Sequence, residues 1–414
     1  MVDVVLINPR AEGVGNILGG SIPLGIACLG ESVLSSGFSV KCFDLCASLM
    51  NLNEVVDEIS RENPLVVGIS ALTASLPKVY VLIKLLRQAG VNRIVVGGAH
   101  ITCDPESIAH LGVDYGFLGE GDETFKEFVC ALAEGKELGS RNGILSVGEK
   151  TRKQGERQFV PPEKIPTPAR HLFNQYNYEF TTTNISRGCP FSCIYCSMSC
   201  TNFRVRLMKD VISELKEIHS SKIRVLDFID DVFTQDRDYV ETLCHQLKRE
   251  KIEFKWACTT RVDLIDEKLL RLMKSAGLRH ISFGVETGSE ELRGRIGKKI
   301  SNDQIERAFK LCRELNIFCR AYGMFGHPGE TIKDMEETIR FLKSLKADDF
   351  VVRITDIVPE TKIYEIALKE GLITEDVWVD YMKGKIPYPT YIPQGVNLKE
   401  MVKLLNKMNN NKGK

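Results

Sequence analysis

The chain has 414 residues, 43% of them hydrophobic, and its 55 basic residues balance its 55 acidic residues. This length predicts two or three domains, and the balanced charge gives no electrostatic reason to expect a nucleic-acid partner. No apolar run reaches the roughly 18 residues that span a membrane, the start lacks a signal-peptide pattern, and 13 cysteines lie scattered through the chain, so we expect a cytoplasmic protein with no transmembrane segment.

Residues 1–138 alternate short apolar runs with helix-like segments. The expected strands are VDVVLIN, FSVKCFD, LVVGIS, RIVVGG and VDYGFL, and the expected helices cover 23–37, 52–61, 76–89, 105–110 and 123–133. Apolar strands joined by helical crossovers predict an α/β domain with a parallel, doubly wound sheet. Ligands bind such sheets at the carboxyl ends of the strands, and glycines in GIS, GGAH and GEGDE follow three of these ends, where they allow a large ligand to approach the backbone.

The rest of the chain divides into three parts. Residues 139–180 are polar and contain several prolines, and we interpret them as a linker with room for one small hairpin. Residues 181–360 predict a second α/β domain, a partial (β/α)6 barrel, and residues 361–414 a small C-terminal extension. The barrel strands are FTTTNIS, RVLDFID, IEFKWAC, RHISFGVE, IFCRAYGMF and FVVRITDI, with helices at 208–220, 239–250, 266–276 and 331–345 and one that a capping box opens at Ser301.

Four cysteines crowd the segment RGCPFSCIYCSMSC after the first barrel strand. Cys189, Cys193 and Cys196 have the spacing C-x3-C-x2-C, whereas structural zinc sites use four ligands in two separated pairs, and a reducing compartment opposes disulfides. An iron–sulfur cluster remains, and three thiolates would leave one iron of a four-iron cluster open to substrate. Cys200 is the alternative fourth ligand, although it lies just beyond the loop. Tyr195 offers an aromatic face for packing near an adenine.

This cysteine spacing resembles the radical S-adenosylmethionine (SAM) superfamily. Further matches follow later strands in the segments FIDDVFT, TTRVDLID, FGVETGSEEL and GMFGHPGET. The resemblance implies that Cys189, Cys193 and Cys196 bind a 4Fe-4S cluster and that its open iron binds SAM. The SAM contacts that it implies are Glu286, Arg261, Asp231, Tyr195, Gly326 and Pro328.

The first domain resembles the Rossmann-like cobalamin (B12)-binding domain of class B radical SAM methyltransferases. The matching segments are INPR, PLGIACLGESVLSSGFSVKCFD, VGISALTAS, VVGGAHITCDPE and YGFLGEGDETF. The D-x-H-x-x-G motif, whose histidine binds cobalt in other cobalamin proteins, is missing, so His100 is not assigned as a ligand. The cobalamin contacts that the resemblance implies are Ser70, Leu72, Thr73, Gly97, Gly98, Gly119 and Gly121. Ser70 and Thr73 have an alternative role as caps of the following helix.

The two resemblances imply an anaerobic enzyme that methylates an unactivated sp3 carbon, by 5′-deoxyadenosyl radical hydrogen abstraction and methyl transfer from methylcobalamin. They imply an external one-electron reductant of the ferredoxin or flavodoxin type. The substrate is interpreted as a peptide or protein residue, such as a glutamine of methyl-coenzyme M reductase. Alternatives are cyclisation or rearrangement, methylation of a lipid or natural-product intermediate, and a sensor that binds cobalamin without catalysis. A methylthiotransferase needs a second three-cysteine set, which the first domain lacks.

Overall fold

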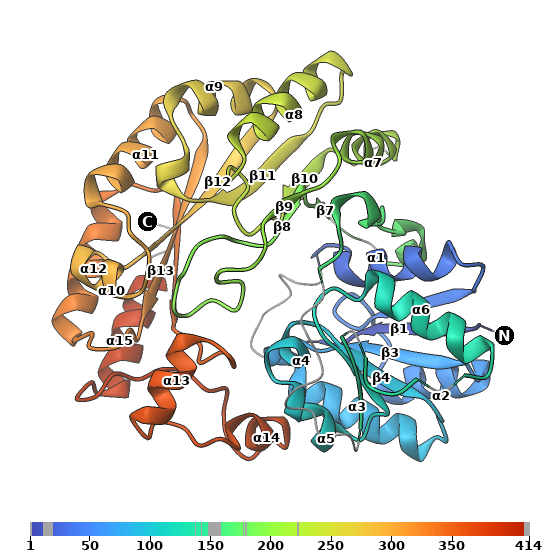
Figure 1. Ribbon diagram of the computed structural model, residues 1–414. Helices are drawn as coiled ribbons and strands as arrows, with labels where there is room; N and C mark the ends of the chain where they lie inside the picture. Colours follow the sequence, from blue (N-terminus) through green and yellow to red (C-terminus); the bar gives the residue numbers. More distant parts are fainter. Residues whose placement is uncertain are drawn as a thin grey trace. The chain divides into compact units, whose positions relative to one another are not determined.

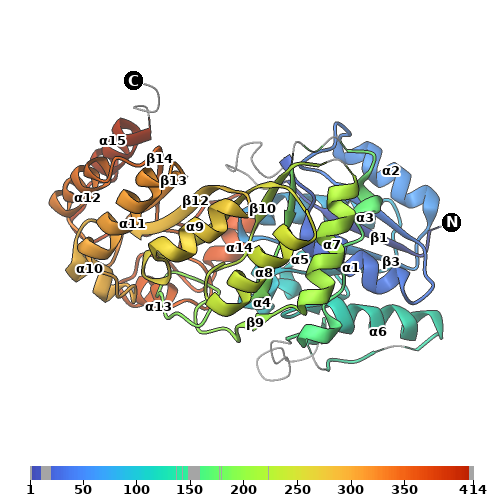
Figure 2. The ribbon, with the colours of Figure 1, turned by 90° about the horizontal axis from the view of Figure 1, so that it is seen from above.

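The computed structural model describes residues 2–10, 20–136, 138–141, 143–147, 159–176, 178, 180–221 and 223–409. The chain forms two compact units, Met1–Thr181 with Thr374–Tyr388, and Thr182–Ile373 with Pro389–Lys414. Each unit contains one large sheet covered by helices (Figures 1 and 2), which confirms the predicted α/β class. In the described part of the chain, no helix combines the length and the apolar character needed to cross a membrane.

The sheet of the first unit has the strand order β2-β1-β3-β4-β5-β6. Its strands are β1 (Val4–Asn8), β2 (Val40–Asp44), β3 (Val66–Ser70), β4 (Ile94–Gly97), β5 (Tyr115–Phe117) and β6 (Ile144–Ser146). The first five are parallel, and β6 pairs antiparallel with β5. Because the strand order reverses between β1 and β3, the carboxyl ends of these two strands flank the switch point at which such sheets bind ligands.

Helices cover both faces of this sheet, with α1 beside α6 on one face and α2 beside α3 on the other (Figure 1). The helices are α1 (Leu24–Leu34), α2 (Leu52–Glu62), α3 (Leu76–Gln88), α4 (Ala99–Cys103), α5 (Ile108–Leu111), α6 (Asp122–Ala133) and α14 (Val377–Met382), with 3-10 turns η2 (Thr73–Ser75), η3 (Pro105–Ser107), η5 (Pro162–Lys164) and η6 (Arg170–Phe173). The helix predicted over 105–110 forms as the 3-10 turn η3 followed directly by α5, whereas α4, which a break at Asp104 separates from η3, was not predicted. Pro105 explains the break, because a proline disfavours helical backbone at the preceding residue.

The segment interpreted as a linker contributes structure to the first unit. β6 extends the sheet, and the hydroxyl of Tyr178 donates to the Asp44 carboxylate over 2.9 Å at the end of β2. The hydroxyl of Tyr176 accepts a hydrogen bond from the Asp44 backbone N–H over 3.0 Å. Residues 148–158, the most polar part of the segment, lie outside the described residues.

The sheet of the second unit has the order β14-β13-β12-β11-β10-β7. Its strands are β7 (Thr181–Thr183), β10 (Val225–Phe228), β11 (Lys255–Thr260), β12 (Leu278–Glu286), β13 (Phe318–Phe325) and β14 (Asp349–Ile354), and its helices are α7 (Met208–Ser220), α8 (Arg237–Arg249), α9 (Glu267–Ser275), α10 (Glu290–Arg295), α11 (Asn302–Glu314) and α12 (Ile332–Ser344), with the 3-10 turn η7 (Val262–Leu264). The pairs from β10 to β14 are parallel. Because β7 and β14 both lie at edges, the six strands form the open, partial barrel that the sequence predicts.

The C-terminal extension belongs to both units. α13 (Lys362–Lys369) and α15 (Leu398–Asn409) are part of the second unit, whereas α14 lies in the first. Met401 and Met408 of α15 are fully buried in the core of the second unit.

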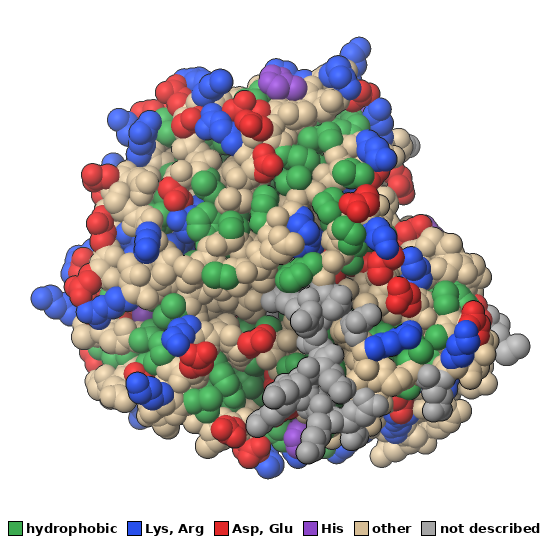
Figure 3. Space-filling model, in the orientation of Figure 1, with side chains coloured by type: hydrophobic (Ala, Val, Ile, Leu, Met, Phe, Trp, Pro, Cys, Tyr) green, Lys and Arg blue, Asp and Glu red, His purple; other side chains and the backbone are tan. Residues whose placement is uncertain are grey.

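On the face in Figure 3, acidic and basic side chains are interspersed, as the equal counts of the two charges lead one to expect.

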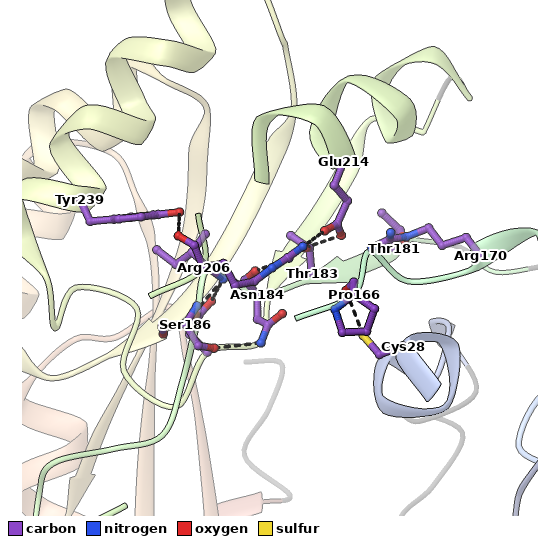
Figure 4. A network of polar contacts seen from close by, with 12 residues as sticks. Cys28, Pro166, Arg170, Thr181, Thr183, Asn184, Ser186, Arg206, Glu214 and Tyr239 are labelled. Carbon is purple, nitrogen blue, oxygen red and sulfur yellow. Dashed lines mark hydrogen bonds and ion pairs between the residues drawn. The ribbon is translucent and has the colours of Figure 1, made fainter. Parts of the chain in front are cut away.

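A buried ion pair anchors α7 beneath the first barrel strand (Figure 4). Arg206 Nη2 lies 2.6 Å from Glu214 Oε2, with side chains 2% and 0% exposed. The Thr183 hydroxyl donates to Glu214 over 2.7 Å, and Arg206 Nη1 donates to the carbonyl of Asn184 over 2.8 Å. These contacts therefore connect β7, which precedes the cysteine segment, to α7, which follows it.

Replacing one member of this pair leaves the other charge buried without its counterion. We expect Glu214→Gln to lower the free energy of unfolding by about 3–5 kcal/mol, measured by urea unfolding with the tryptophan fluorescence of the second unit as the probe. Glu267→Gln removes an exposed pair to Arg271 and should cost less than about 1 kcal/mol. Equal losses in the two variants would contradict a structural role for the buried pair.

Candidate active site

The cysteine segment is a loop that short strands close at its base. β8 (Ser186–Arg187) pairs antiparallel with β9 (Arg204–Val205), so the sequence-predicted strand FTTTNIS is split between β7 and β8. Gly188 has a φ of +88°, and a Cβ there would collide with the carbonyl of Asn202. Asp230, after β10, accepts hydrogen bonds from the backbone N–H groups of Ile185 and Ser186 over 3.0 and 2.6 Å. The loop therefore starts from a fixed position at the carboxyl end of the sheet.

The structure brings the thiols of Cys189, Cys193 and Cys196 together in this loop. Each of Cys189 and Cys196 lies close enough to the charge of Cys193 and of Asp231 for both to raise its pKa. Burial is the larger cause, and it raises the pKa of Cys196 to about 11. Thiols such as those of Cys189 and Cys196 stay neutral without a partner, and a bound metal deprotonates them, so the loop is suited to metal binding rather than to nucleophilic chemistry.

The ligand atoms do not converge on one point. In the described residues, no group of three Cys, His, Asp or Glu side chains has the geometry for a single metal ion. A four-iron cluster binds each thiolate through a different iron, so its ligands need not converge. The N–H of Met198 donates to Cys196 Sγ over 3.4 Å, the kind of bond that tunes cluster thiolates. Cys200 is exposed, with a φ of +55°.

Arg261 follows β11 and contacts the cysteine loop. Its guanidinium carbon lies 3.8 Å from the centre of the Phe191 ring, inside the loop. Asp263 accepts hydrogen bonds from Nε and Nη2 over 3.0 and 2.8 Å. The side chain is 8% exposed, and Nη1 is buried without a hydrogen-bond partner in the described residues. A buried, unpaired donor on a charged group beside the thiols is the feature expected of an anion-binding group.

Glu286 ends β12 in a strained conformation and forms a buried ion pair. Its φ is +65°, and the register of β12 against β13 shifts between Gly284 and Glu286. Lys298 Nζ lies 2.7 Å from Glu286 Oε1, with side chains 8% and 7% exposed. A Cβ on Gly284 would collide with both charged groups. Strain of this kind costs about 1–3 kcal/mol and clusters at functional sites.

The loop that carries Lys298 lies against the cysteine loop. The N–H of Ile194 donates to the carbonyl of Ile296 over 3.1 Å. A Cβ on Gly297, whose φ is +80°, would collide with the carbonyl of Ser192. The Glu286–Lys298 pair is thereby positioned next to the cysteine loop.

His327, after β13, is a third group of this site. It is fully buried, and both ring nitrogens lack a hydrogen-bond partner in the described residues. Burial lowers its pKa to about 4, which keeps the ring neutral, and the nearby charge of Glu286 raises the pKa by less. Its ring centre lies 6.4 Å from that of Tyr195. An unpaired neutral imidazole can offer one donor and one acceptor to a ligand.

Two sequence-predicted residues near His327 also have packing roles. Gly326 has a φ of +91°, and a Cβ there would collide with the carbonyl of Tyr391. Tyr195 packs against a small cluster around α13, and burial, with the charge of Glu286 second, raises its pKa. Pro328 is half-buried in the same loop. Whether these residues contact SAM stays a prediction.

The arrangement fits SAM bound at a cluster. The amino-acid end of SAM carries an ammonium and a carboxylate, and the site offers the Glu286 carboxylate, the Lys298 ammonium and the free Nη1 of Arg261. Asp231 is exposed near Cys189 and Cys196. Sequence reasoning missed Lys298 and His327, because nothing in a lone lysine or in the segment GHPGE distinguishes a buried side chain from an exposed one.

In the first unit, the predicted cobalamin contacts lie at the carboxyl ends of β3, β4 and β5. Leu72 is 41% exposed, and the hydroxyl of Thr73 lies 3.2 Å from Nδ1 of the fully buried His100. The helix-cap alternative is wrong, because α3 begins without a side-chain cap and Ser75 bonds instead to the backbone of Leu72. Ser70 is half-buried. The exposed Leu72 and the oriented Thr73 fit a large, partly apolar ligand at this edge.

The predicted glycines of this edge have packing roles as well. A Cβ on Gly98, whose φ is +104°, would lie 2.9 Å from the carbonyl of Ala71. A Cβ on Gly97 would press on Phe117, and one on Gly121 on Leu29. Gly119 has a φ of +77°, and its N–H donates to the Thr102 hydroxyl over 2.9 Å. Close packing thus suffices to explain Gly97, Gly98 and Gly121, and their role toward cobalamin stays a prediction.

Two family models match the two units. The model of the radical SAM superfamily matches residues 183–342, and that of the B12 binding domain matches residues 13–129. An uncharacterized methyltransferase of Pyrococcus horikoshii is 30% identical, over 92% of this chain and 86% of the relative. The anaerobic magnesium-protoporphyrin IX monomethyl ester cyclase of Rubrivivax gelatinosus is 25% identical, over 83% of this chain and 66% of the relative.

A solved structure supports the fold independently. The radical SAM methyltransferase TsrM from Kitasatospora setae, with cobalamin and a 4Fe-4S cluster bound, is 18% identical and has a TM-score of 0.74 over 89% of this chain and 78% of TsrM. At this identity the likeness concerns the fold. Together with the family models and the Pyrococcus relative, it leads to one conclusion. The chain belongs to the cobalamin-dependent radical SAM family, whose cofactors are a 4Fe-4S cluster, SAM and cobalamin.

Proposed function

We propose that this radical SAM enzyme is a methyltransferase whose acceptor is an unactivated sp3 carbon. The observation that carries the proposal is the combination of a three-cysteine loop with a B12-binding unit in one chain. The names of the Pyrococcus relative and of TsrM, both methyltransferases, support it. When bound, the cofactors supply a 5′-deoxyadenosyl radical and a methyl group, which is the chemistry that a carbon without an acidic proton requires.

The residues of this chain would hold and orient these cofactors. Cys189, Cys193 and Cys196 bind the cluster, and Glu286 and Arg261 bind the polar end of SAM. The remaining SAM contacts are Asp231, Tyr195, Gly326 and Pro328, and the cobalamin contacts are Ser70, Leu72, Thr73, Gly97, Gly98, Gly119 and Gly121. The neutral His327 faces Tyr195 and Glu286 and adds a polar group on the nucleoside side.

We propose a peptide or protein residue as the acceptor, which is the substrate class that the resemblance implies. The polar pairs His280–Ser282 and Arg320–Asp349 lie near the amino ends of β12, β13 and β14, away from the carboxyl ends where the cysteine loop begins, so they do not bear on this choice. A glutamine peptide of methyl-coenzyme M reductase is the first substrate to test, with flavodoxin as the electron donor.

Methyl transfer and cyclisation leave different products from SAM. With reductant, substrate and SAM, we expect S-adenosylhomocysteine and 5′-deoxyadenosine to form in similar amounts, because one SAM supplies the methyl group and another the radical. Chromatography with SAM deuterated at its methyl group measures both. The Rubrivivax relative, a cyclase, supports the alternative, in which 5′-deoxyadenosine forms without deuterium transfer. Release of neither product would contradict both. Mass spectrometry of extracts with and without the gene, searched for a mass difference of one CH2 group, identifies the acceptor.

A further inference from the structure

The segment 374–388 belongs to the unit that binds cobalamin, although neither family model includes it. Its helix α14 packs against α3. The hydroxyl of Tyr381 donates to the carbonyl of Ala74 over 3.2 Å, and Ala74 lies in η2, directly after the predicted cobalamin contacts Leu72 and Thr73. A segment from the far end of the chain thus contacts the carboxyl edge of the first sheet.

Trp378 is the centre of this contact. It is 2% exposed, and its ring meets that of His100 edge-on, with centres 5.7 Å apart. His100 Nδ1 lies 3.2 Å from the Thr73 hydroxyl, and Nε2 lies 3.1 Å from the Ser107 hydroxyl. Ser107 in turn donates to Asp104 over 2.5 Å. His100 is therefore held from two sides, and it fixes the side chain of Thr73 rather than facing a ligand itself.

The indole N–H of Trp378 is buried without a hydrogen-bond partner in the described residues. The chain has two tryptophans, and the other, Trp256, donates to the carbonyl of Ala276 over 2.9 Å. Buried donors are nearly always paired in native proteins, so this orphan calls for a partner that the described part of the chain does not supply. Leu72, with its side chain 41% exposed on the adjacent loop, is a second group left for a ligand.

We propose that the segment 374–388 is part of the cobalamin site and that Trp378 donates a hydrogen bond to the bound corrin. Amide side chains surround the corrin ring, and their carbonyl oxygens are acceptors suited to an indole N–H. In this arrangement Trp378 is a binding residue and His100 is a positioning residue that orients Thr73. The proposal rests on cobalamin binding by the first unit and deepens the assignment of that site.

The test compares the two tryptophans in the full-length protein. Trp378→Phe keeps an aromatic ring but removes the donor, so the Kd for hydroxocobalamin, measured by equilibrium dialysis, should rise about tenfold. The melting temperature without cobalamin should fall, because phenylalanine leaves a cavity in place of the larger indole, but by less than in Trp256→Phe, since no existing hydrogen bond is lost. Trp256→Phe breaks an existing bond and should lower the melting temperature while leaving the Kd unchanged.

A second measurement does not depend on how Trp378→Phe folds. In the Trp256→Phe variant, Trp378 is the remaining fluorophore, and hydroxocobalamin should quench its emission in a saturable manner with the Kd found by dialysis. Unchanged affinity in Trp378→Phe, or emission that cobalamin does not quench, would overturn the proposal. If the wild-type protein fails to bind hydroxocobalamin, the cofactor assignment itself is wrong. The binding assay contains neither SAM nor substrate, so its result can be interpreted even if the protein does not transfer methyl groups.

Discussion

Alanine at Cys189, Cys193 or Cys196 should abolish cluster binding and SAM cleavage, whereas alanine at Cys200 should leave both near the wild-type level. In the proposed site, each of the three thiols supplies one of only three protein ligands to the cluster, so no spare ligand compensates for a loss. The three thiols also lie close together in the loop, because Cys193 raises the pKa of both Cys189 and Cys196. Iron and sulfide content and 5′-deoxyadenosine release after anaerobic reconstitution measure the two losses.

Cys200→Ala is the matched control for these variants, because it changes the same loop at an exposed thiol. A cluster that depends on Cys200 would be capped by four thiolates and closed to SAM, and the assignment of an open iron would then fail. Zinc in place of iron in anaerobically purified protein would contradict the cluster itself. Melting temperatures measured before reconstitution separate loss of the ligand from loss of the fold.

The sequence carries enough information for most of this fold because its signals are local. α7 begins and ends at the predicted residues, and Ser301 and Gln304 form the predicted capping box at the start of α11. Buried parallel strands appear in the sequence as apolar runs, and this pattern does not depend on which strands they pair with. Residues 105–110 are helical as predicted, but the short helix α4 before them was missed.

Long-range contacts account for what the sequence could not reveal. The segment 139–180 is polar and contains several prolines, which predicts a linker. Hydrogen bonds between Asp44 and the hydroxyls of Tyr176 and Tyr178 nevertheless attach it to the first unit. The same limit applies to the site. The cysteine spacing predicts the cluster ligands without a structure, since the spacing itself is the signal. Lys298 becomes a candidate only when its burial and its pairing with a strained Glu286 are known.

Lys298→Met should weaken the binding of SAM about 10- to 100-fold, which corresponds to the loss of a hydrogen bond to a charged group. The binding of 5′-methylthioadenosine should not change. Glu286 and Lys298 form a buried ion pair beside the cysteine loop. In the proposed site, the carboxylate of Glu286 would bind the ammonium of the amino-acid end of SAM, and the ammonium of Lys298 would bind its carboxylate. 5′-Methylthioadenosine has the same nucleoside but lacks that end, so its binding should not depend on either residue. Equilibrium dialysis of both ligands against reconstituted protein measures the difference.

Two further variants show whether the loss arises from recognition or from misfolding. Lys299→Met changes the neighbouring lysine, which is exposed, and should bind SAM like the wild type. Lys298→Met alone leaves Glu286 charged and unpaired, which costs about 3–5 kcal/mol of stability. The double variant Glu286→Gln with Lys298→Met removes both charges and should regain that stability, since a neutral pair of similar size replaces a buried ion pair at little cost. If the double variant is stable and binds SAM as tightly as the wild type, the pair is structural, and the amino-acid end of SAM must be held by Arg261 and the cluster alone.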